Sequence, residues 1–262
     1  MLDAFCASAL RALSPVELND DMMRSFSALY DRVKEVNGEI NITAIDGMCP
    51  VVLRHFADSL SLLSVKDFCQ SKAPVVCDIG CGGGFPGLPI KIAKPDMWLS
   101  MIDSTEKKLK SVETTAQIIG INDISFFPRR AEEIGKASQF REKYDFAVAR
   151  AVAGLNVLSE LCLPFVKQSG YFLAMKGARA DEEIAVSQKA IKMLGGEIIE
   201  KLRVDIKYED VMKAAGENAT ADEADELKKF CDMSRYIIII KKTARTDQKY
   251  PRQYSRISKN PL

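Results

Sequence analysis

The sequence is poor in the residues that build metal centres and membrane spans. It holds a single histidine, and its seven cysteines form no CxxC pair. We therefore expect no bound metal, no disulfide framework, and the reduced thiols of a cytoplasmic protein. No stretch approaches the ~20 apolar residues that a transmembrane helix needs, so we expect no membrane span.

The charge of the chain is nearly balanced but unevenly distributed. The formal net charge is +1 over 262 residues, which indicates no particular class of partner. A segment near 208–230 is acidic, whereas the residues from 241 onward are mostly basic, and a basic tail is typical of contact with a polyanion. The apolar content of 47% is that of a globular protein, and the length suits one large domain with an extension.

Strand-like and helical runs alternate from residue 75 onward. This alternation predicts parallel βαβ units in a doubly wound, Rossmann-like α/β sheet. The last two strands are separated by a segment without an obvious helix, which predicts an antiparallel hairpin joined by a loop. The expected strands are 75–79, 98–102, 124–127, 144–149, 171–175, 197–204 and 236–240, and the expected helices among them are 105–119, 155–165 and 180–194.

Two helices are expected before the first strand. Apolar residues over 20–36 form one stripe, Asn19 can cap the start, and Asn37-Gly38 can end the helix. Pro50 opens the second helix, in the position where its missing N–H is harmless. The predicted division is an N-terminal helical extension (1–70), a Rossmann-like domain (71–245) and a basic C-terminal tail (246–262).

A glycine-rich turn follows the first strand directly. Its glycines let the backbone bend tightly and approach a ligand with no Cβ in the way. A literal GxGxxG begins at Gly82, so an NAD(P)-dependent oxidoreductase is one alternative. However, Gly80 is the glycine that closes the strand, and counted from Gly80 the third glycine position holds Phe85.

Two acids at strand ends indicate a different ligand. Asp78 ends the first strand and would repel a pyrophosphate, but it suits a ligand that carries an ammonium and a sulfonium. S-adenosylmethionine is such a ligand. Asp103 closes the second strand, where an acid accepts hydrogen bonds from ribose hydroxyls. The turn therefore favours a methyltransferase over a dehydrogenase.

Several short motifs occur together in one order along the chain. They are Asn41-Ile42-Thr43, Arg54-His55, Asp58-Ser59, the segment from Cys77 through Pro89, Asp103-Ser104, Ala131-Glu132 and Ala149-Arg150-Ala151. With them the chain resembles the RsmG (GidB) family, the 16S ribosomal RNA guanine-N7 methyltransferases, from about residue 20 to the end. The acidic insert near 208–230 is longer than expected for this family, and we expect it to affect local surface rather than the site.

The resemblance implies a cofactor, a partner and a set of site residues. The cofactor is S-adenosylmethionine, and the partner is 16S ribosomal RNA or the small ribosomal subunit, on which we expect a monomer to act. The implied cofactor-binding residues are Gly80, Phe85, Asp103, Ala131, Glu132 and Arg150, and the implied substrate-side residues are Arg150, His55, Asn41 and Arg54.

The residues after the fourth strand bear on the acceptor atom. Methylases of exocyclic amines usually place an Asp/Asn-Pro-Pro-aromatic turn there, and this chain has Arg150-Ala151 instead. Guanine N7 has an available lone pair and loses no proton, so alignment with the sulfonium methyl suffices and no general base is predicted. A non-catalytic RNA-binding module that kept the fold is the remaining alternative.

Basic residues near the glycine turn predict a rim for RNA phosphates. Lys107, Lys108 and Lys110 lie near the start of a helix, against the preference of the helix dipole. With Arg129, Arg130 and the basic tail they are predicted to contact phosphates, and a merely solvated face is the alternative.

Overall fold

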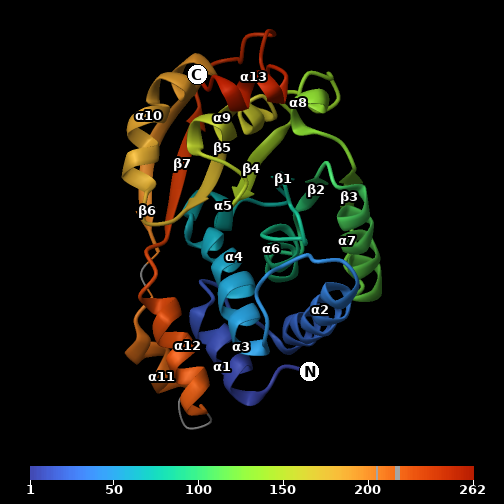
Figure 1. Cartoon of the computed structure of the whole chain (residues 1–262), viewed down its shortest axis with the longest axis vertical. Coiled ribbons are helices and arrows are strands. Elements are labelled where there is room, and N and C mark those ends of the chain that lie inside the picture. Colours follow the sequence, from blue (N-terminus) through green and yellow to red (C-terminus); the bar gives the residue numbers. More distant parts are fainter. Residues whose placement is uncertain (205, 216–218) are drawn as a thin grey trace.

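A computed structural model describes residues 1–204, 206–215 and 219–262. Its centre is a seven-stranded sheet in the order β3-β2-β1-β4-β5-β7-β6, in which β7 runs antiparallel to β5 and β6 (Figure 1). The predicted doubly wound α/β fold is therefore confirmed. The strands are β1 (Val75–Ile79), β2 (Trp98–Ile102), β3 (Ile124–Phe127), β4 (Tyr144–Arg150), β5 (Val166–Lys176), β6 (Gly196–Arg203) and β7 (Tyr236–Lys242).

Helices cover both faces of this sheet. Alternate residues of each strand enter different apolar cores: Ile237 and Ile239 of β7 belong to one, and Ile238 and Ile240 to the other. The run 236–240 is thus buried on both faces, as its composition predicts. Outside the acidic insert, the helices that follow β1 in the described residues are α6 (Gly87–Ala93), α7 (Glu106–Ile118), α8 (Ala131–Ile134), α9 (Leu155–Cys162), α10 (Ala180–Met193) and α13 (Tyr254–Lys259).

The N-terminal helices pack on the core that α6 and α7 share with the sheet. The predicted helix after Asn19 is confirmed, because the Asn19 side chain accepts a hydrogen bond from the N–H of Met22. It extends beyond its predicted end, and the Asn37 side chain instead accepts from Ile42 and Thr43, which turns the chain back. The elements are α1 (Ala4–Leu13), α2 (Asp20–Glu39), α3 (Met48–Val51), a π-helical segment (Val52–Ala57), α4 (Asp58–Leu60), a 3₁₀ segment (Ser61–Ser64) and α5 (Lys66–Gln70).

The acidic insert corrects one prediction. β6 and β7 do form an antiparallel pair, but two helices lie between them instead of a loop: α11 (Tyr208–Ala215) and α12 (Ala221–Cys231). Thr220 and Glu223 begin α12 with a capping box, a pattern that the sequence contains. α11 packs against α1 and α12 against α3, at the end of the molecule away from α13 (Figure 1). Residues 216–218 of the insert lie outside the described part of the chain.

The basic tail is folded onto the domain rather than extended from it. Arg252 forms an ion pair with the fully buried carboxylate of Glu160, with a shortest N–O distance of 2.6 Å. α13 follows and packs beside α9. Arg252 therefore fixes the tail in place with its guanidinium paired inside the protein, and contact of the basic tail with RNA phosphates stays a prediction.

Across the described residues, no helix combines the length and the apolar character that crossing a membrane requires.

Candidate active site

Two cavities adjoin each other at the carboxyl edge of the sheet, where the strand order reverses between β1 and β4. This is the place where open α/β sheets bind ligands. The smaller cavity has a volume of about 300 Å³ and the larger about 980 Å³. Ala151 and Val152, directly after β4, line both. The smaller cavity brings together four predicted cofactor residues, namely Gly80, Asp103, Ala131 and Glu132.

The glycine turn has no room for a side chain at its first position. Gly80 has a φ of +73°, a conformation that L-residues with a side chain rarely adopt. A Cβ there would lie 2.6 Å from Cγ2 of Val152, a residue that lines both cavities. Gly82 also has a positive φ, of +53°, but a Cβ there would meet no atom within 4 Å. Gly80 is thus the position where a side chain would reach into the site.

Asp103 holds the glycine turn from the end of β2. Its Oδ2 accepts a hydrogen bond from the N–H of Gly82, and its Oδ1 accepts from the N–H of Thr105, both at 2.8 Å. Each carboxylate oxygen retains a further lone pair. The side chain lines the smaller cavity, so these lone pairs are available to ligand hydroxyls.

Asp78 lies fully buried beneath the same turn. Its Oδ2 accepts a hydrogen bond from the N–H of Gly87 at 2.8 Å, whereas its Oδ1 has no partner among the described residues. Burial raises the pKa of Asp78 to about 7, although the Gly87 hydrogen bond and the charge of Arg150 act in the opposite direction. The turn therefore has a carboxyl group that a nearby positive ligand would help to ionise.

Asp78→Asn is expected to remove a pH dependence of stability. Because the pKa of Asp78 is about 7 in the folded protein against 3.8 for the ordinary group, its contribution to the free energy of unfolding is full below 3.8. That contribution falls as the pH rises and is lost once the pH has passed 7. Between about pH 6 and pH 8.5, the melting temperature of the ligand-free wild-type protein should fall by roughly 2–6 °C more than that of the variant. The Asn side chain can still accept the hydrogen bond from Gly87. Equal falls in melting temperature for the two proteins would therefore contradict the raised pKa of Asp78.

The far end of the smaller cavity is closed by α8 and by the tail. Glu132 is buried although it begins a helix, and Ala131 lies beside it. Tyr254 of α13 completes this wall, with the guanidinium of Arg130 5.9 Å from its ring centroid. No local sequence pattern indicates that Tyr254 belongs to this site, because its position depends on how the tail folds back.

These residues fit an adenosyl ligand. Ile79, Ile102 and Leu161 give the smaller cavity apolar surface for a flat ring, and Asp103 presents acceptors for ribose hydroxyls. Asp78, when ionised by a positive ligand, would supply negative charge beneath the turn. No phosphate-binding device is needed for such a ligand.

Arg150 connects the sheet to the N-terminal helices beside the larger cavity. Its Nη1 donates to the carbonyl oxygen of Arg54 and to Oδ2 of Asp58, both at 2.9 Å. Arg54 lies in the π-helical segment, and such segments occur frequently at functional sites. The Arg150 side chain is only 14% exposed, so it is positioned by these contacts rather than by solvent.

The protonation of His55 follows from its two neighbours. Arg150 Nη2 lies 3.0 Å from Nδ1 of His55, and a guanidinium can only donate, so Nδ1 accepts. Nε2 then carries the proton and donates to Oγ1 of Thr43 at 2.7 Å. Burial, and then the positive charge of Arg150, lower the pKa of His55 to about 3. His55 is therefore a neutral bridge between Arg150 and Thr43.

Phe85 and Asn41 lie in different surroundings. The Phe85 ring is stacked on His55 at 4.4 Å between centroids, and Arg150 lies 5.5 Å from the same ring. Phe85 is buried in this group and does not line the smaller cavity, so its contact with cofactor stays a prediction. Asn41 is exposed, next to Ile42, which packs against Gly83 of the turn. Its substrate-side role also stays a prediction.

His55→Ala is expected to weaken methyl transfer more than cofactor binding. Without the imidazole, Arg150 loses one acceptor and its stacked neighbour, so its orientation toward the larger cavity relaxes. We expect kcat/KM to fall roughly 10–100-fold and the Kd for S-adenosylhomocysteine to change less than about twofold. Thr43→Val, which removes the far end of the bridge, should give a smaller loss of the same kind. Equal losses in both readouts would exclude His55 from the substrate side.

The acidic insert reaches this site, which corrects the expectation that it affects local surface alone. Glu226 of α12 accepts a hydrogen bond from Nη2 of Arg54 at 3.0 Å, across 172 positions of sequence. Arg54 lines the larger cavity and its carbonyl oxygen binds Arg150. The insert thus neutralises one cation at the edge of the site.

The chain matches known proteins over most of its length. A family model described as rRNA small subunit methyltransferase G matches residues 22–208. A protein named Ribosomal RNA small subunit methyltransferase G from Ligilactobacillus salivarius is 41% identical over 249 residues, covering 94% of each chain. Its namesake from Alkaliphilus oremlandii is 38% identical over 247 residues, covering 94% of this chain and 93% of the relative.

Solved structures agree with the fold. A putative sarcosine dimethylglycine methyltransferase from Galdieria sulphuraria superposes with a TM-score of 0.52 at 12% identity, over 83% of this chain and 99% of that one. The cyclase SpnF superposes with a TM-score of 0.51 at 15% identity, over 82% and 94%. At these identities the likeness extends to the fold alone.

Proposed function

The chain belongs to the rRNA small subunit methyltransferase G family, and on this premise we propose that it transfers the methyl group of S-adenosylmethionine to N7 of a guanine in 16S ribosomal RNA. Membership of the family makes it an S-adenosylmethionine-dependent methyltransferase. The acceptor atom and the roles of individual residues belong to the proposal.

One observation carries the proposal: the two cavities lie on either side of the turn that follows Arg150, and both are lined by residues of that turn. The smaller cavity suits the adenosyl group, and the larger is of a size that accommodates a nucleotide. Because Ala151 and Val152 line both cavities, a methyl donor in one and an acceptor base in the other would meet there. Arg150 is then the side chain placed to hold the edge of the guanine.

The groups around Arg150 support an acceptor that needs no deprotonation. Both nitrogens of His55 are engaged, and Asp58 is paired with Arg150. A base with a free lone pair, such as guanine N7, requires only alignment with the methyl group. In A-form RNA this atom faces a deep and narrow groove, so the target guanine lies in an exposed loop or an open particle.

The residues of the smaller cavity would hold the cofactor, which when bound supplies an electrophilic methyl group on its sulfonium. Gly80 permits close approach of the backbone, and Asp103 would accept from the ribose hydroxyls. Ala131 and Glu132 would flank the adenine, with Tyr254 on the outer side. Phe85 would act indirectly, since it supports His55 and Arg150.

The setting of the reaction follows from the substrate. We propose that a monomer acts in the cytoplasm on the small ribosomal subunit, without a metal, and that the domain boundaries lie near residues 70 and 245. Arg129 and Arg130 line the smaller cavity and are exposed, and Lys107 and Lys110 are exposed on α7, so all four remain candidates for phosphate contact.

Transfer of label from S-adenosylmethionine tests this function against its alternatives. The protein is incubated with labelled methyl donor and small subunits that lack the modification, and label should enter the 16S RNA. Binding of the RNA without methyl transfer would favour the alternative that the protein is a non-catalytic RNA-binding module. Tight binding of NAD(P) together with no binding of S-adenosylmethionine would favour the oxidoreductase, for which the structure offers no particular support.

A further inference from the structure

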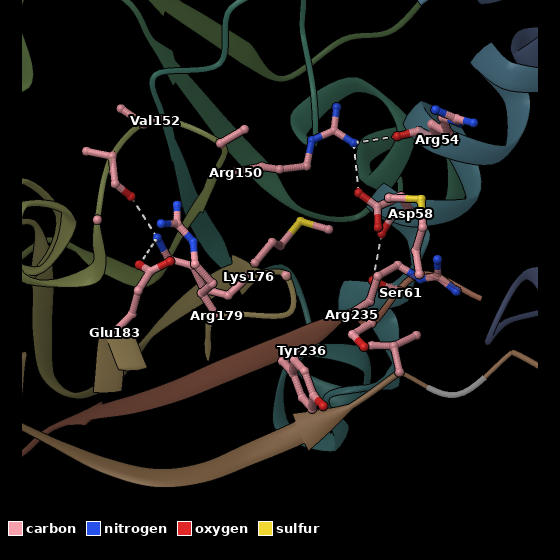
Figure 2. Close-up of a pocket in the computed structure, with 18 of the residues that line it drawn as sticks. Arg54, Asp58, Ser61, Arg150, Val152, Lys176, Arg179, Glu183, Arg235 and Tyr236 are labelled. Carbon is pink, nitrogen blue, oxygen red and sulfur yellow. Dashed lines mark hydrogen bonds and ion pairs between the residues drawn. The ribbon is translucent and has the colours of Figure 1, made fainter. Parts of the chain in front are cut away.

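The larger cavity extends past Arg150 to the start of α10, where a second guanidinium lies. Arg179 directly precedes α10 and lines the cavity together with Glu183 and Val186. The spacing of four and seven residues places these side chains on one face of the helix. Figure 2 shows Arg179 beside Lys176 and Glu183, across the cavity from Arg150 and Asp58.

Arg179 differs from the other cations of this cavity. Its guanidinium makes no hydrogen bond or ion pair with any residue that the structure describes, and the residue is exposed. Glu182 is the cavity-lining acid next to it, also exposed. The other cations are engaged: Arg54 with Glu226, Arg150 with Asp58, Lys176 with Glu183, and Arg235 with the carbonyl oxygen of Phe230.

The wall near Arg179 is also apolar. Val186 is 64% exposed and Met233 is 47% exposed, and both line the cavity with the ring of Tyr236. Exposed apolar and aromatic surface beside a cation is what a single-stranded nucleotide requires, because its base has a flat apolar face and its backbone is anionic. A solvated arginine alone would not explain the adjoining apolar side chains.

We propose that Arg179 binds a backbone phosphate of the RNA beside the target nucleotide, while Val186 and Met233 contact an adjacent unstacked base. This inference rests on the proposed function, since it places the flanking RNA in the cavity where Arg150 meets the target. A guanidinium forms two parallel hydrogen bonds to phosphate, so Arg179 would fix the register of the strand rather than read its sequence.

Arg179→Gln tests the inference, with Lys189→Gln as the matched control. Lys189 is exposed on the same helix but does not line the cavity. The substrate is the small subunit that lacks the modification, and kcat and KM are measured at several salt concentrations. Arg179→Gln should raise KM about tenfold, lower the salt slope of log(kcat/KM) by about one, and leave the Kd for S-adenosylhomocysteine unchanged. Arg179→Lys should recover part of the loss.

The outcomes separate this inference from the proposed function. If the wild-type protein methylates the subunit and Arg179→Gln behaves like Lys189→Gln, the phosphate contact is refuted while the function stands. If the wild-type protein transfers no methyl group to the subunit, the proposed function itself fails. A loss in Arg179→Gln that includes weaker binding of S-adenosylhomocysteine would also overturn the inference, because a phosphate contact does not act on the cofactor.

Discussion

Gly80→Asp is expected to abolish cofactor binding. The substitution requires an L-side chain at a φ of +73° and places its Cβ 2.6 Å from Val152, so the turn or the Ala151-Val152 segment must move. It also adds a carboxylate near Asp78 and Asp103, where acidic charge is already concentrated. We expect the Kd for S-adenosylhomocysteine, measured by calorimetry, to rise at least about 100-fold, and methyl transfer to be lost.

Gly82→Ala is the matched control for this prediction. Gly82 has a positive φ of the same kind, but its Cβ would meet open space. Both variants therefore carry backbone strain, and Gly80→Asp adds the clash and the charge. Gly82→Ala should bind with a Kd within about tenfold of the wild type, as expected for about 1 kcal/mol of strain. Wild-type affinity in a folded Gly80→Asp protein would refute the assignment of the turn to the cofactor.

Arg150→Ala is expected to cause the largest fall in kcat. The substitution removes the donor for Asp58, for Nδ1 of His55 and for the carbonyl oxygen of Arg54, all in a largely buried place. It also removes the side chain that we propose to hold the edge of the acceptor guanine. We expect kcat to fall about 100–1,000-fold, with a lower melting temperature because Asp58 loses its partner.

Arg150→Lys tests whether the positive charge of Arg150 is sufficient or whether the geometry of its guanidinium is also needed. A lysine keeps the positive charge near Asp58 but cannot donate to three acceptors in the fixed directions of a guanidinium. The melting temperature should therefore recover more fully than kcat, which we expect to stay at least about tenfold below wild type. An Arg150→Ala enzyme with wild-type kcat would show that Arg150 is structural only.

Much of the cofactor side could be predicted from the sequence because it is local. Asp78 lies near the end of β1 and Gly80 directly follows that strand, whereas Asp103 directly follows β2, which pairs with β1 in parallel. Once the strands are recognised, their carboxyl ends meet at one edge. The position of Arg150 follows for the same reason, since β4 pairs with β1.

The features that the sequence does not reveal depend either on packing between distant segments or on a local sequence that is not typical of its secondary structure. Glu226 binds Arg54 only because α12 packs against α3, and no local pattern encodes that packing. Tyr254 reaches the smaller cavity because Arg252 pairs with Glu160. The sequence does not predict the first residues of β5 as strand, because Lys167, Gln168 and Ser169 are polar and exposed, which is not the pattern of a buried strand.

Strand cleavage specific for N7-methylguanine tests whether the methyl group goes to N7 of a guanine. Small subunits that lack the modification are treated with the protein and S-adenosylmethionine, and the 16S RNA is cleaved and mapped. A single new cleavage at one guanine, absent with Gly80→Asp, is the predicted result. Transfer of label to the RNA without N7-sensitive cleavage would place the methyl group on another atom and contradict transfer to N7.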